Sequence, residues 1–358
     1  MDFIDLTSLH SYSYLLVLAA ILLTTKLLGL FSRWVRLPQV LGALVAGVIL
    51  GPVVNAIVGW STGDGFFSQA AGSDQLFGML SELGVIVLMF GAGLETDVQE
   101  MKKCGKASLI IAVIGVVTPL IFGAGASYFF IDDPNSQEKL LKSIFIGVVL
   151  TATSVSITVE TLKELGKLNT PASNAILGAA IIDDVLGIIA LTIITSFKSK
   201  DVNIWFVLIK IVLFFIFAAI LGFIMLKIYK WMNKHTSRDS RRHVIIAFAY
   251  CLVSSFVAEV FFGVADITGA YVAGLVLSMT NRKRYLVNRF STLSYMLLSP
   301  IFFACIGLTI EMPELTVSLL VFAILITIVA VATKLFGCAL GGKICGYSTK
   351  ECFQIGAG

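Results

Sequence analysis

Two adjacent aspartates, Asp183 and Asp184, lie in the middle of an apolar run from residue 171 to residue 197, and Asp184 is its central residue. A helix of that length rises about 1.5 Å per residue and crosses the hydrocarbon core of a bilayer, so the pair would lie near the midplane. One aspartate at that depth costs about 2.5–3.5 kcal/mol, and two neighbouring carboxylates cannot both ionise freely. The pair therefore requires partners, and the natural ones are a cation or protons.

The composition indicates an all-α, polytopic membrane protein. Of the 358 residues, 58% are hydrophobic and only 13% are charged, which is too apolar for a soluble domain. The net charge of +4 is spread over many loops, so no nucleic-acid-binding patch is expected. We expect eleven spans and the start of a twelfth within residues 1–358. The apolar runs lie near residues 11–32, 37–57, 79–96, 106–129, 140–162, 171–197, 203–231, 243–262, 266–281, 288–309 and 314–340.

The basic residues predict an orientation. They gather in alternate loops, for example at Arg33 and Arg36 and throughout the loop 227–242. The opposite loops contain few basic residues. Because basic loops remain in the cytoplasm, the N-terminus is expected outside the cell membrane.

A nine-residue segment occurs twice. Residues 42–50 (GALVAGVIL) return as residues 269–277 (GAYVAGLVL), with six of nine positions identical. Two shorter pairs follow in the same order, Gly93-Leu94 with Gly307-Leu308 and Phe122-Gly123 with Phe336-Gly337. A single match between helices rich in small residues can arise by chance, but three in order favour a duplication. The second span maps onto the ninth, and this odd offset predicts an inverted repeat. By this comparison the chain stops before its last one to two spans.

The stretch 151–158 (TATSVSIT) places five hydroxyl groups inside a span. Serine and threonine compete for backbone hydrogen bonds, so a break in the helix at Thr153 and Ser154 would free carbonyl groups to face a cation. The alternative is an ordinary helix whose hydroxyls bond carbonyls one turn earlier.

Three further charged residues need an interpretation. Lys334 lies well inside the run 314–340, and an intramembrane aspartate is its expected partner; the alternative is that its ammonium reaches the interface. Lys26 is closer to an interface and is expected to extend to it. Glu95, at the end of the third span, could line an access funnel, although a solvated helix end is the simpler interpretation.

Together these residues resemble those of bacterial sodium/proton antiporters in the monovalent cation:proton antiporter superfamily, and within it the second subfamily. The motifs that carry the resemblance are Ala152–Ile157 (ATSVSI), Ala179–Gly187 (AAIIDDVLG), the two Gly-Ala-x-Val-Ala-Gly helices, and Lys334 before Phe336-Gly337. The double aspartate in this context is specific, whereas the glycine motifs alone are weak.

The resemblance implies a role for each of these residues. Asp184 would bind the monovalent cation or a proton, Asp183 would pair with Lys334 in one protonation state, and Thr153 and Ser154 would lie where a discontinuous helix crosses the site. It also implies crossed broken helices and a homodimer in the inner membrane. Core-type helices would occupy approximately residues 79–197 and 288–358, and dimerisation or scaffold helices approximately residues 11–57 and 203–281.

The expected activity is secondary active exchange of a monovalent cation, first of all Na⁺, for protons by alternating access, without a cofactor. Exchange of K⁺ for protons by a member of the same superfamily is the alternative, and the residues leave Li⁺ open as well. A passive cation channel would also use carboxylates, but an inverted repeat with a buried lysine argues against it. An intramembrane aspartyl protease would need its aspartates on separate helices, so no enzyme is expected.

Overall fold

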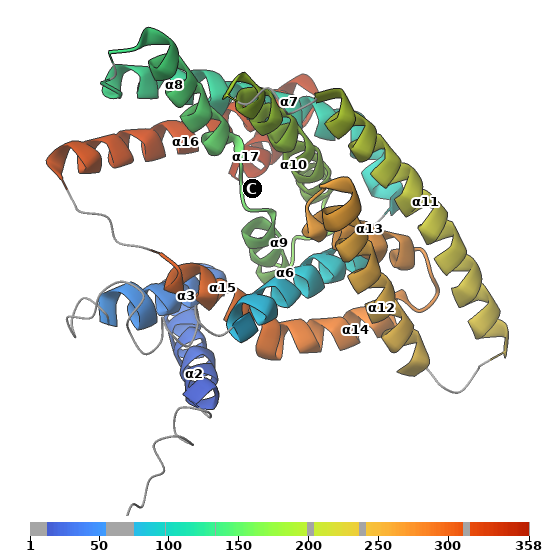
Figure 1. Ribbon diagram of the computed structural model, residues 1–358. Helices are drawn as coiled ribbons and strands as arrows, with labels where there is room; N and C mark the ends of the chain where they lie inside the picture. Colours follow the sequence, from blue (N-terminus) through green and yellow to red (C-terminus); the bar gives the residue numbers. More distant parts are fainter. Residues whose placement is uncertain are drawn as a thin grey trace, which may run out of the picture.

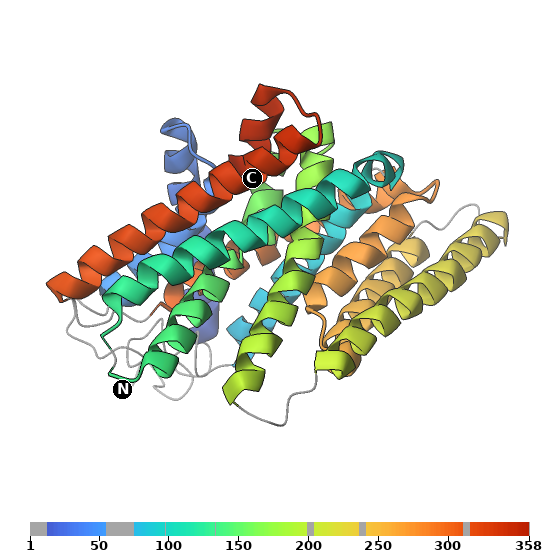
Figure 2. The ribbon, with the colours of Figure 1, turned by 90° about the horizontal axis from the view of Figure 1, so that it is seen from above.

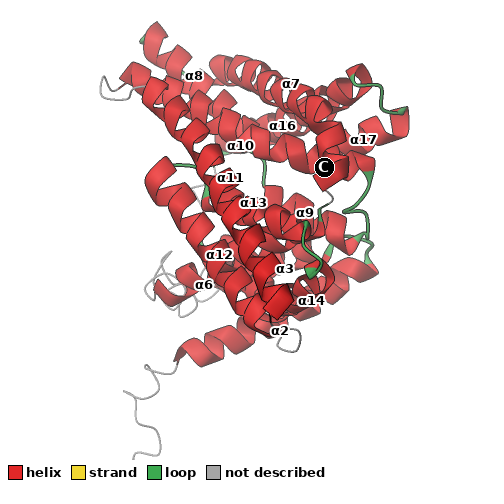
Figure 3. Cartoon of the chain, turned by 90° about the vertical axis from the view of Figure 1, so that its right-hand side faces the viewer, coloured by secondary structure: helices red, strands yellow, loops and turns green. Residues whose placement is uncertain are grey.

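The computed structural model describes residues 13–54, 75–96, 98–132, 134–198, 204–235, 241–310 and 316–357. Within these ranges the chain is helical and contains no strand (Figure 3). The first half of the chain forms α2 (Ser13–Trp34), α3 (Gln39–Val48), the π-helical turn η1 (Ile49–Val53), α6 (Gln75–Glu95), α7 (Val98–Phe130), α8 (Ser136–Thr151), α9 (Val155–Glu164) and α10 (Pro171–Lys198). The second half forms α11 (Ile204–His235), α12 (Arg241–Val257), η2 (Ala258–Phe262), α13 (Asp266–Ser278), α14 (Lys283–Leu293), η3 (Ser294–Leu298), α15 (Ser299–Leu308), α16 (Val317–Ile344) and α17 (Thr349–Ala357).

Over the described residues each predicted apolar run is mostly helical, and the run 140–162 is interrupted at residues 152–154. In the described residues, nine helical stretches are long and apolar enough to cross a membrane, and two shorter apolar helices, Gln39–Val53 and Asp266–Ser278, account for the other two runs. The segment α17 lies where the twelfth run begins. The protein is therefore a multi-pass helical membrane protein.

Large apolar side chains cover much of the outer surface. On α16, Ile324, Ile328 and Val331 are each at least 60% exposed and recur at helical spacing, so they form one outward face. Such a surface would aggregate in water, and lipid is the solvent that it fits.

Local signals in the sequence set several helix ends. The side chains of Asn135 and Thr316 accept backbone N–H groups at the starts of α8 and α16. Pro171 begins α10, where its missing N–H group costs nothing. Gly166 follows α9 with a φ of 64°, a conformation that glycine adopts without strain.

The long helices pack in two regions (Figure 1). One contains α7, α8, α10, α16 and α17, with α7 in contact with each of α8, α10 and α16. Viewed from above, α16 runs alongside α7 for much of its length (Figure 2). In the other region α6 packs along α13, and α2, α3 and α15 pack together. The short helix α9 lies between them and contacts α3, α6 and α10.

Two glycine crossings join the repeated segments. Gly93 of α6 meets Gly274 of α13, and a methyl group on either would collide with backbone atoms of the other helix. Gly47 of α3 meets Gly307 of α15 in the same way. Each crossing pairs a helix of the first half of the chain with a helix of the second. Small residues allow this close approach of helices in a membrane.

Candidate functional site

The helix α10 lies against α7 through small residues that set the direction of the aspartates. Ala172, Ala175 and Ala179 pack against apolar residues of α7, and Ser108 of α7 donates a hydrogen bond to the carbonyl of Ala175 at 3.1 Å. Asp183 lies eleven residues after Ala172, about three helical turns, so it continues the same face. The carboxylate of Asp183 is thereby directed towards α7 and its neighbour α16.

Asp183 is held by two partners. The Lys334 ammonium of α16 donates to both carboxylate oxygens, at 3.3 Å to Oδ1 and 3.2 Å to Oδ2. The Thr153 hydroxyl donates to Oδ2 at 3.1 Å. The two charged side chains are only 15% and 11% exposed, for Lys334 and Asp183 respectively, so water screens this ion pair weakly. They border a cavity of about 630 Å³, together with Thr153.

Lys334 owes its position to a tight contact between α16 and α7. Gly337, one turn after Lys334, lies against the side chain of Thr118, and a methyl group there would collide with its hydroxyl oxygen. The same hydroxyl lies 2.8 Å from the carbonyl oxygen of Ile114 and 3.2 Å from that of Thr333. The contacts of Thr333 and Gly337 with Thr118 thus fix the position of Lys334 along α16.

Asp184 has a different environment from its neighbour. Successive helix residues point about 100° apart. Asp184 therefore shares a face with Leu177 and Ile181, which pack into the central cluster that includes residues of α6, α9 and α13. Its side chain is half-buried, and among the described residues it makes no hydrogen bond or ion pair. One carboxylate of the pair is thus neutralised by the protein, and the other is open.

The span that faces the aspartates is broken, as its hydroxyl-rich stretch predicts. The helix α8 ends at Thr151, α9 begins at Val155, and the residues Ala152 and Ser154 between them have extended backbone angles. Thr153 reaches Asp183 from this break. Ser154 instead caps α9 by accepting the backbone N–H group of Ile157 at 3.4 Å. A crossing with a second broken helix stays a prediction.

Glu95 lies away from the aspartates. It ends α6 and forms an ion pair with Lys163 of α9, with 3.6 Å between Nζ and Oε1. The Lys283 ammonium also donates to the carbonyl groups of Glu95 and Thr96. Its expected place in an access funnel stays a prediction.

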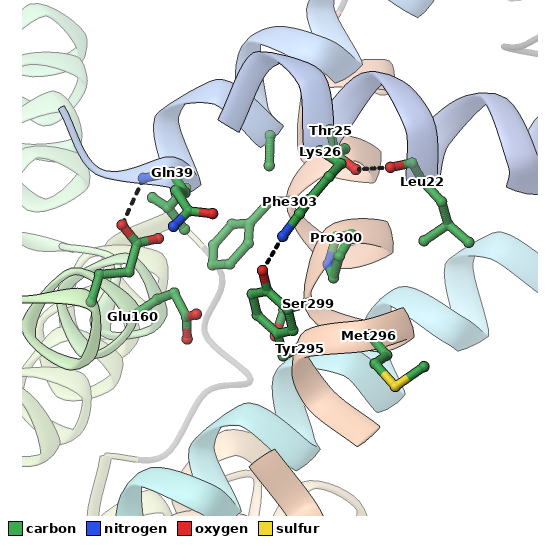
Figure 4. Close-up of a pocket in the computed structure, with 13 residues that line it drawn as sticks. Leu22, Thr25, Lys26, Gln39, Glu160, Tyr295, Met296, Ser299, Pro300 and Phe303 are labelled. Atoms are coloured by element: carbon green, nitrogen blue, oxygen red, sulfur yellow. Dashed lines mark hydrogen bonds between the residues drawn. The ribbon is translucent and has the colours of Figure 1, made fainter. Parts of the chain in front are cut away.

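A second cavity, of about 240 Å³ and lined by both polar and apolar side chains, was not expected from the sequence (Figure 4). The Lys26 ammonium of α2 donates to the hydroxyl of Tyr295 in η3, and its expected extension to an interface stays a prediction. Glu160 of α9 lines the same cavity, and one turn later Glu164 accepts the backbone N–H group of Gln39 at 2.7 Å. A carboxylate at Glu160, inside an apolar span, was the available signal.

The oxygen atoms gathered around Asp183 and Asp184 suit a small, hard cation or a proton. Carboxylate, hydroxyl and backbone carbonyl oxygens are the ligands such a cation prefers. In the described part of the chain, no group of three or more His, Cys, Asp or Glu side chains has the geometry of a metal site.

Comparisons with known proteins agree with this chemistry. Residues 18–358 match the family described as sodium/hydrogen exchanger, transmembrane. The chain is 38% identical to the probable Na⁺/H⁺ antiporter GerT of Bacillus cereus over 346 residues, covering 95% of this chain and 85% of that protein. It is 35% identical to the Na⁺/H⁺-K⁺ antiporter GerN of the same organism, with 97% and 84% covered. A Na⁺/H⁺ antiporter of Enterococcus hirae is 31% identical, with 96% and 85% covered.

A solved structure shares the fold. The sodium proton antiporter MjNhaP1 of Methanocaldococcus jannaschii, determined at pH 8, superimposes with a TM-score of 0.64 and covers 96% of this chain and 81% of its own. The sequence identity is 20%, so this similarity concerns the arrangement of the helices alone.

Proposed function

Because this chain belongs to the sodium/hydrogen exchanger family and is a monovalent cation:proton antiporter, we propose that the Asp184 carboxylate is the group for which the cation and the proton compete. The observation that carries this proposal is the contrast within the pair. Lys334 and Thr153 occupy the oxygens of Asp183, whereas Asp184 has no such partner among the described residues. A bound cation or proton is what neutralises it.

Exchange follows from the energetic cost of charge in the membrane. An ionised, empty Asp184 near the midplane carries a penalty of a few kcal/mol, and this penalty opposes the movement of the site across the apolar barrier. A bound Na⁺ or a proton cancels the charge. The site therefore crosses in one loaded form or the other, and the two substrates take turns. A path open to both sides at once would dissipate the gradient, so access alternates.

The residues around Asp184 take supporting roles in this proposal. Thr153 and Ser154 supply oxygen atoms at the break between α8 and α9, where the Ser154 carbonyl already accepts the N–H group of Thr158 at 3.4 Å. The Lys334 ammonium neutralises Asp183, so that the site presents one negative charge to a monovalent ion instead of two. No cofactor is needed for this cycle.

Sodium is the first candidate for the cation, since the similar proteins GerT and the Enterococcus hirae antiporter are named for Na⁺ and H⁺. GerN is also named for K⁺, so K⁺ is the second candidate. A passive channel is disfavoured by the ion pair between Lys334 and Asp183, which leaves Asp184 as the single open carboxylate. Competition between a cation and a proton requires one shared binding group, whereas simple conduction of a cation does not.

We also propose that the predicted core helices move as a unit against the predicted scaffold helices. The core covers approximately residues 79–197 and 288–358, and the scaffold covers approximately residues 11–57 and 203–281. The two glycine crossings support it, because each joins one scaffold helix (α3 or α13) to one core helix (α15 or α6). They are related by exchange of the two halves of the chain, as an inverted repeat requires. A homodimer in the inner membrane, with its N-terminus outside, completes the proposal.

The decisive experiment is exchange in sealed proteoliposomes that contain a pH-sensitive dye. Addition of Na⁺ to the wild-type protein should release protons from the opposite side, and Asp184→Asn should abolish the response. Asp132→Asn makes the same chemical change in an exposed loop and should leave the response intact. Cation-dependent pH changes that persist in Asp184→Asn would overturn the proposal, and cation flux without proton flux in the wild type would indicate a channel.

A further inference from the structure

The cavity beside α9 separates helices on opposite sides of the proposed boundary between scaffold and core. Its scaffold wall comes from α2 and α3, with Lys26 and Gln39, and its core wall from α9 and η3, with Glu160 and Tyr295 (Figure 4). Two polar contacts cross the boundary here. They are the Lys26 ammonium with the Tyr295 hydroxyl and the Gln39 N–H group with the Glu164 carboxylate.

The carboxylate of Glu160 is not satisfied in this arrangement. Its Oε2 atom is shielded from solvent and has no hydrogen-bond partner among the described residues. A buried carboxylate oxygen left in this way is costly, so a partner is expected at some point in the cycle. The carboxylate of Glu164, one turn away, is occupied by the N–H group of Gln39.

Two ammonium groups of the described residues are candidates for that partner. Lys163 lies one turn further along α9, but it is paired with Glu95 of α6 at 3.6 Å. Lys26 lines the cavity, and it rests on Tyr295, 4.4 Å from the ring centroid, without an ion pair to Glu160. A neutral hydroxyl is a weaker partner for an ammonium than a carboxylate. Lys26 is therefore the group that would gain from a contact with Glu160.

We propose that Lys26 is a two-position contact of the transport cycle, which bonds Tyr295 in the present conformation and Glu160 in the other conformation. This inference rests on the proposed exchange function. Movement of the core past the scaffold carries both Tyr295 and Glu160 past Lys26, so one ammonium serves two partners in turn. The contact stabilises each end state and leaves the intermediate positions without it. A pair of discrete arrangements of this kind is what makes an interface bistable.

Opposite effects on the two end states provide the test. Tyr295→Phe removes the partner of Lys26 in the present conformation and shifts the population to the other one. Glu160→Gln removes the charged partner in the other conformation and shifts the population back. Loss of one hydrogen bond to a charged group changes such an equilibrium about tenfold. The apparent KM for Na⁺ at a given face should therefore rise in one variant and fall in the other, with the signs reversed at the opposite face.

The measurement is Na⁺-dependent proton release from proteoliposomes of known orientation, with Na⁺ varied separately at each face. Lys26→Gln should lose both contacts. When it is combined with Tyr295→Phe or with Glu160→Gln, the second substitution should therefore cause no further change in KM. Lys210→Gln is the matched control, because Lys210 is also a lysine of a spanning helix but lies over Phe206 of its own helix, away from the cavity. It should leave the KM at both faces unchanged.

Changes of the same sign in Tyr295→Phe and Glu160→Gln, or equal changes at both faces, would overturn the proposal and indicate a structural role. If one variant does not fold, the conservative Glu160→Asp, which keeps the charge at a shorter reach, should shift KM in the direction of Glu160→Gln by a smaller factor. If the wild-type protein showed no Na⁺-dependent proton release, the proposed function would be refuted instead. Failure of the Lys26 proposal and failure of the proposed function are therefore distinguishable.

Discussion

Removal of the Lys334 ammonium should destabilise the protein in a way that depends on pH. In Lys334→Gln the Asp183 carboxylate loses the cation that lies 3.2 Å from its Oδ2 atom. Removing one partner of a buried ion pair costs about 3–5 kcal/mol. The variant can limit this cost by protonating Asp183. For an ordinary aspartate that step costs about 5 kcal/mol at pH 7.5 but only about 1.5 kcal/mol at pH 5.

The sign of the effect follows from the count of protons. In the variant the folded state binds one proton at Asp183 that the unfolded state lacks, so its stability falls as the pH rises. In the wild type the Lys334 ammonium, 3.2 Å from Oδ2, favours the ionised form of Asp183, so the dependence on pH should be weaker there than in the variant. The loss of stability should therefore shrink from about 3–5 kcal/mol at pH 7.5 to about 1.5 kcal/mol at pH 5.

The assay is thermal unfolding of the purified protein in detergent at both pH values. The double variant Asp183→Asn/Lys334→Gln should recover part of the stability at pH 7.5, because it removes the unpaired charge that the single variant leaves at position 183. Lys210→Gln should show no comparable dependence on pH, since its ammonium lies 4.9 Å from the centroid of the Phe206 ring and has no carboxylate partner among the described residues. An equal loss at both pH values, or a double variant less stable than the single one at pH 7.5, would refute the reasoning.

Two further variants test how the site is held. Thr153→Val removes the hydroxyl that donates to Asp183 at 3.1 Å and should raise the KM for Na⁺ about three- to tenfold in proteoliposomes, whereas Thr153→Ser keeps the donor and should stay near wild type. Gly337→Ala forces a methyl group against the Thr118 hydroxyl of α7 and should cost about 1–3 kcal/mol in thermal unfolding, together with a lower exchange rate because Lys334 is displaced. Gly91→Ala is its control, since an added methyl group there meets nothing within 4 Å, and no loss of stability is expected. Equal behaviour of the two alanine variants would contradict the packing argument.

The sequence alone determined the class of the protein, because the interactions that decide the class are local. An apolar run of sufficient length must be helical in a bilayer, where each backbone polar group needs a partner within the segment. The depth of Asp183 and Asp184 follows from counting residues along one such run. The break near Thr153 follows from the hydroxyl-rich stretch in which it lies. These inferences required no knowledge of how the helices pack.

The tertiary structure decided which partner each charged group has. Asp183 and Asp184 are equal by residue type, and it was the family resemblance that assigned Asp183 to Lys334. The packing of α10 against α7 is the physical cause, because it directs Asp183 towards Lys334 and leaves Asp184 on another face of α10. The contact between Lys26 and Tyr295 joins residues far apart in the chain, so no local pattern predicts it. Charged groups in an apolar interior depend on what lies within a few ångströms, and those neighbours come from other helices.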